Sequence, residues 1–240
     1  MLERVIAEIS PTGKLRAAIN TANFLLVNGT NASGDPAGIA PDVAREIAKR
    51  LGVPVSFAPF AKASEIGDSV NSGVWDIAFI GAEPARAEKI FFTAAYVEIE
   101  ATYLVAAGSA ITSLTDVDRP GVRISVGRGS AYDLWLTRHI ANAELVRAPN
   151  VAASYQMFID DKLEVLAGLR PGLISVLEKL PDARILDDRF TSVQQAVGTA
   201  RDNRASAAFL AAFIDEAKRS GFIAKLIEQN GIQGLSVAKL

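Results

Sequence analysis

The sequence predicts an α/β fold made of two lobes, and three observations carry this prediction. Short apolar strand-like runs alternate with amphipathic helix-like segments, in one series near the N-terminus and a second further along the chain. Two longer extended segments, Phe91–Val105 and Val193–Thr199, separate these series from each other and from a helical C-terminus. We therefore expect residues 1–96 and 196–240 to form one lobe, and residues 97–195 the other, joined by a double hinge.

The first series contains three strand-like and three helix-like segments. The strand-like runs are Lys14–Asn20, Val53–Phe57 and Trp75–Ile80. The helix-like segments are Leu2–Ile9, Asp42–Leu51 and Ala63–Ser72. Proline before the second helix and glycine after it are typical of helix starts and ends. This order indicates a mostly parallel sheet with crossover helices, with the Asn/Gly-rich residues 28–38 as a loop.

The second series repeats the alternation. Its strand-like runs are Gly121–Val126, Leu145–Arg147 and Glu164–Ala167. Its helix-like segments are Ala131–Ala141, Val151–Asp160 and Leu173–Leu180. Two more helices, Ala205–Arg219 and Phe222–Glu228, complete the chain. We expect a second mostly parallel sheet flanked by helices.

The composition excludes several kinds of chemistry. The 240 residues include no cysteine and one histidine, His139, so a thiolate nucleophile, a disulfide scaffold and a multi-histidine metal site are excluded. The formal net charge is 25 − 27 = −2, which argues against nucleic acid as a partner. We expect the protein to bind neither a metal nor a cofactor. We also expect it to be a monomer.

Membrane insertion is not expected either. The longest uncharged run, Ala17–Gly34, carries too many asparagine, threonine and serine residues for a bilayer core. The N-terminus shows no basic segment followed by an apolar one, so no signal peptide is visible. Either the protein stays in the cytoplasm or the chain begins after a removed leader.

The order of several short motifs resembles one known family. The matching segments are Gly13–Ile19, Gly38–Ala44, Leu51–Val53, Ser72–Ile77, the set Arg86, Phe92, Thr93 and Tyr96, then Gly129–Ser130 and Ser220–Gly221. In this order the chain is similar to the family-3 extracellular solute-binding proteins, the two-lobed receptors of amino-acid ABC importers with the type II periplasmic-binding-protein fold. The resemblance spans about Gly13 to Gly231.

The resemblance implies a ligand cleft between the lobes, closure by hinge motion, a periplasmic location and a membrane permease as partner. It also implies roles for named residues. Arg86 would hold a ligand carboxylate, and backbone N–H groups at Gly129 and Ser130 would bind the same group. A guanidinium offers two parallel donors to a carboxylate, and a helix N-terminus favours an anion.

The chain departs from the family at two places. Gly81, Ala82, Glu83 and Pro84 replace the hydroxyl-rich run before the arginine. In the second lobe, Leu169 or Arg170 stands where the family has the aspartate that pairs with a ligand ammonium. An unpaired buried ammonium costs several kcal/mol, which is roughly a thousandfold in affinity. The sequence therefore predicts a small anionic or carboxylate ligand that is not an ordinary α-amino acid.

Each candidate residue has a structural alternative. Arg86 could be a surface arginine paired with Glu83 or Glu88, and the Gly127–Ser130 turn could simply begin a helix with Ser130 as its N-cap.

Five further residues are weighed in the same way. Asn23 and Phe24 follow the first strand, where an aromatic ring could stack on the ligand or belong to the core. Tyr132 could reach the cleft or pack. Arg170 could face the ligand or be a solvated loop charge. Gln195 could line the cleft or hydrogen-bond within the hinge.

Two other functions stay open. The first is an enzyme similar to cyclohexadienyl dehydratase, on the same fold, with Glu83 or Glu164 as an acid. The second is a cytoplasmic small-molecule sensor. Neither has a further signature in the chain.

Overall fold

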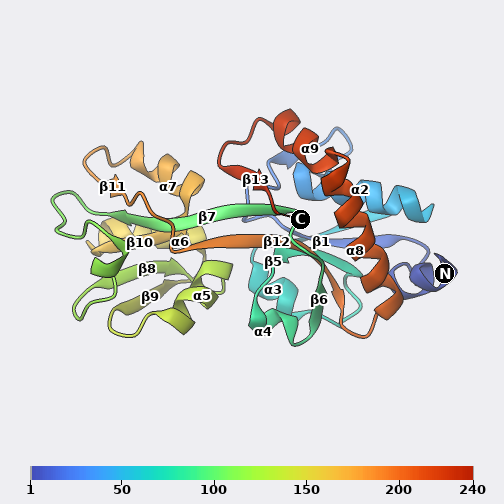
Figure 1. The fold of residues 1–240 in the computed structure, drawn as a ribbon, viewed down its shortest axis with the longest axis horizontal. Coiled ribbons are helices and arrows are strands. Elements are labelled where there is room, and N and C mark those ends of the chain that lie inside the picture. The colour runs from blue at the N-terminus through green and yellow to red at the C-terminus, as the bar shows by residue number, and fades with distance from the viewer. Residues whose placement is uncertain (1, 240) are drawn as a thin grey trace. The chain divides into compact units, whose positions relative to one another are not determined.

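The computed structural model describes residues 2–239, which fall into two compact units. Unit 1 contains the chain up to Glu98 and again from Gln194, and unit 2 contains Ile99–Val193. The chain passes between the units twice, within strand β7 (Val97–Val105) and within strand β12 (Thr191–Ala200). Figure 1 shows both as long arrows. None of the described helices is both long and apolar enough to cross a membrane.

The sheet of unit 1 has a parallel centre. Strands β4 (Val55–Phe60), β1 (Leu15–Asn20) and β5 (Ile77–Gly81) lie in that order and run parallel, and β12 adds an antiparallel strand beside β5. All five residues of β5 are buried, as expected for a central strand covered on both faces. The short strand β6 (Ile90–Phe92) pairs with β12.

The helices of unit 1 cover this sheet and each other. They are α1 (Leu2–Ile9), α2 (Ile39–Leu51), α3 (Ala63–Asp68), α4 (Pro84–Ala87), α8 (Arg204–Arg219) and α9 (Phe222–Asn230). Helix α2 buries Val43, Ala44, Ile47 and Ala48, whose spacing places them on one face of the helix. This helix packs on β1 and β4. Strands β2 (Gly29–Thr30), β3 (Pro36–Ala37) and β13 (Leu235–Val237) complete the unit.

Unit 2 repeats the design with different strands. Strands β10 (Val165–Leu169), β8 (Arg123–Gly127) and β9 (Glu144–Ala148) run parallel, and β7 lies antiparallel to β10. A short strand, β11 (Arg184–Ile185), pairs with β7, and a 3₁₀ turn spans Leu114–Asp116.

Both faces of the unit 2 sheet are apolar. Val165 and Ala167 belong to one buried cluster, and Leu166 between them belongs to another. This alternation is the two-residue period of a strand, so each face has its own core. Helix α6 (Val151–Asp160) packs on β8, β9 and β10, and α7 (Arg170–Leu177) packs on β10 and β11. The third helix, α5 (Ala131–His139), contributes Tyr132 to the first cluster.

Several predicted boundaries are wrong. The helix predicted over Ala63–Ser72 ends at Asp68, and the helix predicted from Asp42 begins at Ile39, with Pro41 in its first turn. The segment Phe91–Val105 is broken into β6 and β7, because residues 93–96 leave the strand conformation while the amides of Thr93 and Tyr96 bond to two alternate residues of β12, at Val197 O and Gln195 O. Helix α7 begins at Arg170 rather than at Leu173, because Pro171 is tolerated in a first helical turn.

Candidate functional site

Arg86 lies at the carboxyl edge of the unit 1 sheet. It belongs to α4, directly after β5, and its Nη1 donates to Gly81 O at 2.7 Å. Only 7% of the residue is exposed, so it is not the surface arginine of the alternative interpretation. Its side-chain stem lies beside Gly67, where a methyl group would contact the Arg86 Cγ at 3.8 Å.

Burial lowers the pKa of this arginine. Desolvation lowers the pKa of Arg86 to about 10, against the opposing attraction of the Glu83 and Asp68 carboxylates. The group therefore remains protonated at neutral pH, and the protein keeps a poorly solvated cation at the end of β5. Such a cation gains free energy from any anion that reaches it.

Asn23, Phe24 and Gln195 lie on segments at the same sheet edge. Strands β1 and β5 are parallel neighbours, with Ile19 opposite Phe79, so the residues that follow them share one edge. Asn23 is buried, and its Oδ1 has no hydrogen-bond partner among the described residues. Phe24 is 48% exposed, so the alternative of a core residue does not apply.

Gln195 and Glu83 contact the end of β5 through the main chain. Gln195 is buried and pairs with Gly81 across the β5–β12 ladder, and its carbonyl accepts from Tyr96 N at 2.9 Å. Glu83 occupies the N-cap position of α4, and its carbonyl accepts from the amides of Arg86 and Ala87. These bonds fix the turn that carries Arg86.

In unit 2, the start of α5 is a complete helix cap. Ser130 Oγ accepts from Asp133 N at 3.1 Å, and Asp133 Oδ2 accepts from Gly129 N at 2.8 Å. Asp133 is buried, and its carboxylate also accepts a hydrogen bond from Arg147 Nε at 2.8 Å. The capping role weighed for Ser130 is thus present, and the Gly129 amide binds a carboxylate of the protein itself.

The backbone amides that could bind an anion lie one or two residues further along, at Ala131 and Tyr132. Ser130 N bonds to Gly127 O at 3.2 Å, whereas the amides of Ala131 and Tyr132 have no hydrogen-bond acceptor among the described residues. First-turn amides of a helix have no intrahelical partner, and they form an anion site when no side chain caps them. Sequence reasoning placed these donors at Gly129 and Ser130, because only the structure shows which amides the cap consumes.

The Tyr132 side chain packs in the core of unit 2. It is buried in the same cluster as Val126 and Leu136, and its hydroxyl has no hydrogen-bond partner among the described residues. Burial raises the pKa of the Tyr132 hydroxyl, so the group is neutral.

Arg170 is tied into unit 2 by three partners. Its Nε donates to Glu100 Oε2 at 2.8 Å, and its other nitrogens donate to the carbonyls of Leu186 at 3.2 Å and Asp187 at 2.6 Å. Arg189 binds the other oxygen of Glu100 at 3.0 Å. Arg170 is therefore not a solvated loop charge, and its role toward a ligand stays a prediction.

Glu164, one of the two acids considered for catalysis, is an ion-pair residue. Arg123 donates to it through Nε, Nη2 and the main-chain amide, at 2.8–2.9 Å. The hydrogen bond from the Arg123 side chain holds the pKa of Glu164 below its usual value. A carboxyl group in this state is ionised at neutral pH and has no proton to give.

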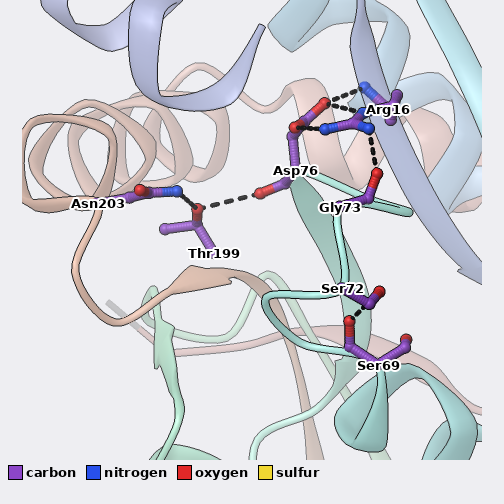
Figure 2. A network of polar contacts seen from close by, with 7 residues as sticks. All are labelled: Arg16, Ser69, Ser72, Gly73, Asp76, Thr199 and Asn203. Atoms are coloured by element: carbon purple, nitrogen blue, oxygen red, sulfur yellow. Dashed lines mark hydrogen bonds and ion pairs between the residues drawn. The ribbon is translucent and has the colours of Figure 1, made fainter. Parts of the chain in front are cut away.

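Sequence reasoning did not find the polar network at the amino edge of β5 (Figure 2). Asp76 lies directly before β5, and its carboxylate accepts hydrogen bonds from the side chain of Arg16 on β1. The main-chain carbonyl of Asp76 accepts a hydrogen bond from Thr199 Oγ1 at 3.0 Å. Asn203 Nδ2 donates to that hydroxyl at 3.1 Å. This network lies at the edge opposite to Arg86, so it supports the sheet rather than the candidate site.

Residues 15–232 match the model of the bacterial extracellular solute-binding proteins, family 3. The chain belongs to this family. A search of curated proteins finds no match. The family-3 resemblance predicted from the motifs is thereby confirmed.

Solved structures share the fold of this family-3 protein over nearly its whole length. A putative ABC-transporter binding component from Wolinella succinogenes, complexed with lysine, is 20% identical, with 90% of this chain and 95% of that chain covered at a TM-score of 0.76. An amino acid ABC transporter substrate-binding protein from Streptococcus pneumoniae, bound to L-arginine, is 22% identical, with 93% and 97% covered at 0.76.

An ancestral amino-acid-binding protein, described as a precursor of cyclohexadienyl dehydratase, is 23% identical. It covers 93% of this chain and 98% of its own, at a TM-score of 0.75. These likenesses confirm the predicted α/β fold of the type II periplasmic-binding-protein class. They establish the fold of the solute-binding protein and leave its ligand to be argued from its own residues.

Proposed function

We propose that this family-3 solute-binding protein binds a small carboxylate-bearing solute through Arg86 and delivers it to the permease of an ABC importer. The observation that carries the proposal is the burial of the Arg86 guanidinium at the carboxyl edge of the unit 1 sheet, where burial lowers its pKa to about 10. A carboxylate would restore much of the solvation free energy that this cation loses, and would accept two parallel hydrogen bonds.

The start of α5 offers a second set of donors for the same anion. The amides of Ala131 and Tyr132 have no acceptor among the described residues, and the helix dipole favours negative charge there. Asp133 adds a carboxylate nearby, but Arg147 neutralises it at 2.8 Å. If the two units close on the ligand, these amides would hold it from unit 2.

Ordinary α-amino acids are proposed to bind more weakly. The segment in which the family places an aspartate for the ligand ammonium here ends in Leu169 and Arg170. Arg170 is held by Glu100 and two carbonyls, so this segment provides no free carboxylate for a ligand ammonium. An ammonium near it would be unpaired, whereas an aromatic or aliphatic end would not need a counter-charge.

Matched pairs of ligands test this proposal. Isothermal titration calorimetry would compare glutamate with glutarate, phenylalanine with 3-phenylpropionate, and leucine with 4-methylpentanoate. We expect at least one carboxylate to bind about a hundredfold more tightly than its amino acid. Tighter binding of the amino acid in every pair would contradict the proposed ligand class. Mass spectrometry of the denatured protein would identify a co-purified ligand.

A dehydratase activity is the second candidate, because the fold resembles that of an ancestral amino-acid-binding protein described as a precursor of cyclohexadienyl dehydratase. In this alternative Arg86 would hold a carboxylate while Glu83 acts as the acid. Incubation with prephenate and with arogenate separates the two functions, because product formation would show an enzyme and its absence with tight binding would show a receptor.

The location outside the cytoplasmic membrane is proposed from family membership alone. Fractionation of cells that express the full natural gene tests it. Recovery of the protein in the periplasmic fraction supports an importer component, and recovery in the cytoplasm supports the sensor alternative.

A further inference from the structure

Unit 2 contains a hollow that the proposed carboxylate site does not use. It has a volume of about 310 Å³, at the lower end of the roughly 300–1,000 Å³ that is typical of small-molecule sites. Three segments line it: the residues after β7, the turn between α6 and β10, and the turn between α7 and β11. The lining residues are Ala106, Ala107, Phe158, Ile159, Lys162, Leu163, Lys179, Leu180, Pro181, Asp182 and Ala183.

The floor of this hollow, which we call the α6–α7 pocket, is apolar. Phe158 and Leu163 are buried and belong to the core cluster on one face of the unit 2 sheet, and Leu180 packs against that cluster. Ile159, also in the lining, is 38% exposed and adds apolar surface at the opening. The pocket is therefore an opening onto the core, where an apolar group would be removed from water.

Lysines supply most of the charge of the pocket lining. Lys162 and Lys179 are exposed, and among the described residues neither ammonium forms an ion pair. Asp182 is the one acidic residue of the lining, so the net charge is 2 − 1 = +1. An apolar floor beneath an excess of unpaired ammonium groups favours a ligand with an apolar body and an anionic end.

The backbone of Lys162 is held in an unusual conformation. Its φ is 48°, in the left-handed region that non-glycine residues rarely adopt. Its carbonyl accepts from Arg123 Nη2 at 2.9 Å, and the neighbouring Leu163 amide bonds to Phe158 O at 3.1 Å. These bonds fix the position from which the Lys162 side chain leaves the main chain, independently of any ligand.

The α6–α7 pocket lies at the opposite edge of the sheet from the candidate carboxylate residues. Lys162 and Leu163 come before β10, at the amino edge of the parallel strands, whereas Arg170 follows β10 and Ser130 follows β8 at their carboxyl edge. Unit 2 would thus carry a second site, separate from the one proposed above.

We propose that the α6–α7 pocket binds a small amphiphilic anion, a monocarboxylate with an aliphatic chain, with its chain on Phe158 and Leu163 and its carboxylate near Lys162 and Lys179. The cavity is too small for a two-chain lipid, and the polar side chains of its lining, Lys162, Lys179 and Asp182, are too few to bind the many hydroxyl groups of a sugar.

A charge series on one alkyl chain tests the proposal. Octanoate, octanol and octylamine would be titrated into the full ¹⁵N-labelled protein, with amide chemical shifts as the readout. We expect octanoate to shift the amides of residues 106–107, 158–163, 179–180 and 182–183, and to bind about tenfold more tightly than octylamine. Because no candidate residue of the carboxylate site belongs to the pocket lining, octanoate bound at that site would shift a different set of amides.

Three variants localise the effect. Lys162→Gln and Lys179→Gln should each weaken octanoate binding about threefold, and Ala107→Trp, at the exposed rim, should abolish it by filling the hollow. Lys14→Gln, an exposed lysine of unit 1, should leave it unchanged. Equal affinity for octanoate and octylamine, or shifts that survive Ala107→Trp in a protein whose remaining spectrum is native, would overturn the proposal.

Discussion

Arg16 and Asp76 form a bidentate ion pair, with 2.9 Å between Nε and Oδ2 and 2.6 Å between Nη2 and Oδ1. The Arg16 amide also donates to Oδ2 at 2.8 Å, and the guanidinium reaches the carbonyl of Gly73 (Figure 2). The pair joins the amino ends of two neighbouring parallel strands, since Ala17 and Ile77, the next residues, face each other in the register.

Unit 2 contains the same device. Arg123 donates from its amide and Nε to one oxygen of Glu164 and from Nη2 to the other, and reaches the carbonyl of Lys162. The next residues, Ile124 and Val165, face each other in the register. The two units thus share a structural repeat that sequence identity does not reveal, because arginine and carboxylate recur but the residues around them do not.

The two pairs differ in burial, and this difference predicts different contributions to stability. The carboxylate side chain is 4% exposed in Asp76 and 36% exposed in Glu164. Asp76→Asn should lower the free energy of unfolding by about 3 kcal/mol, because it leaves a partly buried guanidinium without its counter-charge. Glu164→Gln should lower it by about 1 kcal/mol or less, because water screens the pair. Urea denaturation measures both, and equal losses would contradict the role of burial.

Gly38 is predicted to be irreplaceable for a steric reason. Its φ is 127°, and a Cβ there would lie 2.6 Å from the carbonyl oxygen of Leu26. Gly38→Ala should lower the free energy of unfolding by about 3 kcal/mol or more, since backbone atoms must move. Gly34→Ala is the matched control, because Gly34 has φ 82° and open space, and should lose only about 1 kcal/mol. Similar losses in thermal or urea unfolding would show that φ alone decides.

We predict that replacing Arg86 mainly weakens ligand binding, whereas replacing Arg170 mainly lowers the stability of the fold. Arg86→Met removes a cation that burial disfavours, and with it the hydrogen bond to Gly81 O and the attraction to Glu83 and Asp68, so these terms largely offset and the free energy of unfolding should stay within about 1 kcal/mol of the parent. Binding of the carboxylate found by calorimetry should fall about a hundredfold. Arg170→Met should instead lower the free energy of unfolding by about 1–2 kcal/mol, because the hydrogen bonds from Arg170 to Glu100 and to two carbonyls are lost.

Calorimetry and urea denaturation on the same samples distinguish these outcomes. If Arg86→Met lost several kcal/mol and kept its affinity, Arg86 would be a structural residue. If Arg170→Met kept its stability and lost its affinity, the carboxylate would bind in unit 2 instead.

The acid stability of unit 2 is predicted to depend on Asp116. Hydrogen bonds from the Thr112 amide, the Ser113 hydroxyl and their neighbours hold the pKa of Asp116 at about 2, below the usual 3.8. A carboxyl whose folded pKa is depressed contributes stability above its unfolded pKa and loses it as the pH falls through the folded value. The melting temperature of Asp116→Asn should therefore lie below that of the parent above pH 4, and the two should converge near pH 2.

Circular dichroism melts from pH 6 to pH 2 test this dependence. Asp182→Asn is the control, because Asp182 is an exposed carboxylate without an ion pair among the described residues. A constant difference between Asp116→Asn and the parent at every pH would show that Asp116 acts without its charge.

Much of the secondary structure could be predicted from the chain alone. Helices α1 and α6 begin and end at the predicted residues, because apolar periodicity and turn residues are local signals. The two-residue strands β2, β3 and β11 and the four-residue helix α4 were not predicted. Elements this short have no periodicity of their own and depend on their tertiary neighbours.

The sequence by itself determined the fold class, the family and the position of Arg86 after a central strand, because these depend on the order and spacing of local motifs. Only the tertiary structure decided the state of each charged group. It buried Arg86, bound Arg170 to Glu100 at a separation of 70 residues, and used the Gly129 amide for Asp133. Burial and pairing depend on residues that are distant in the chain, so no local pattern encodes them.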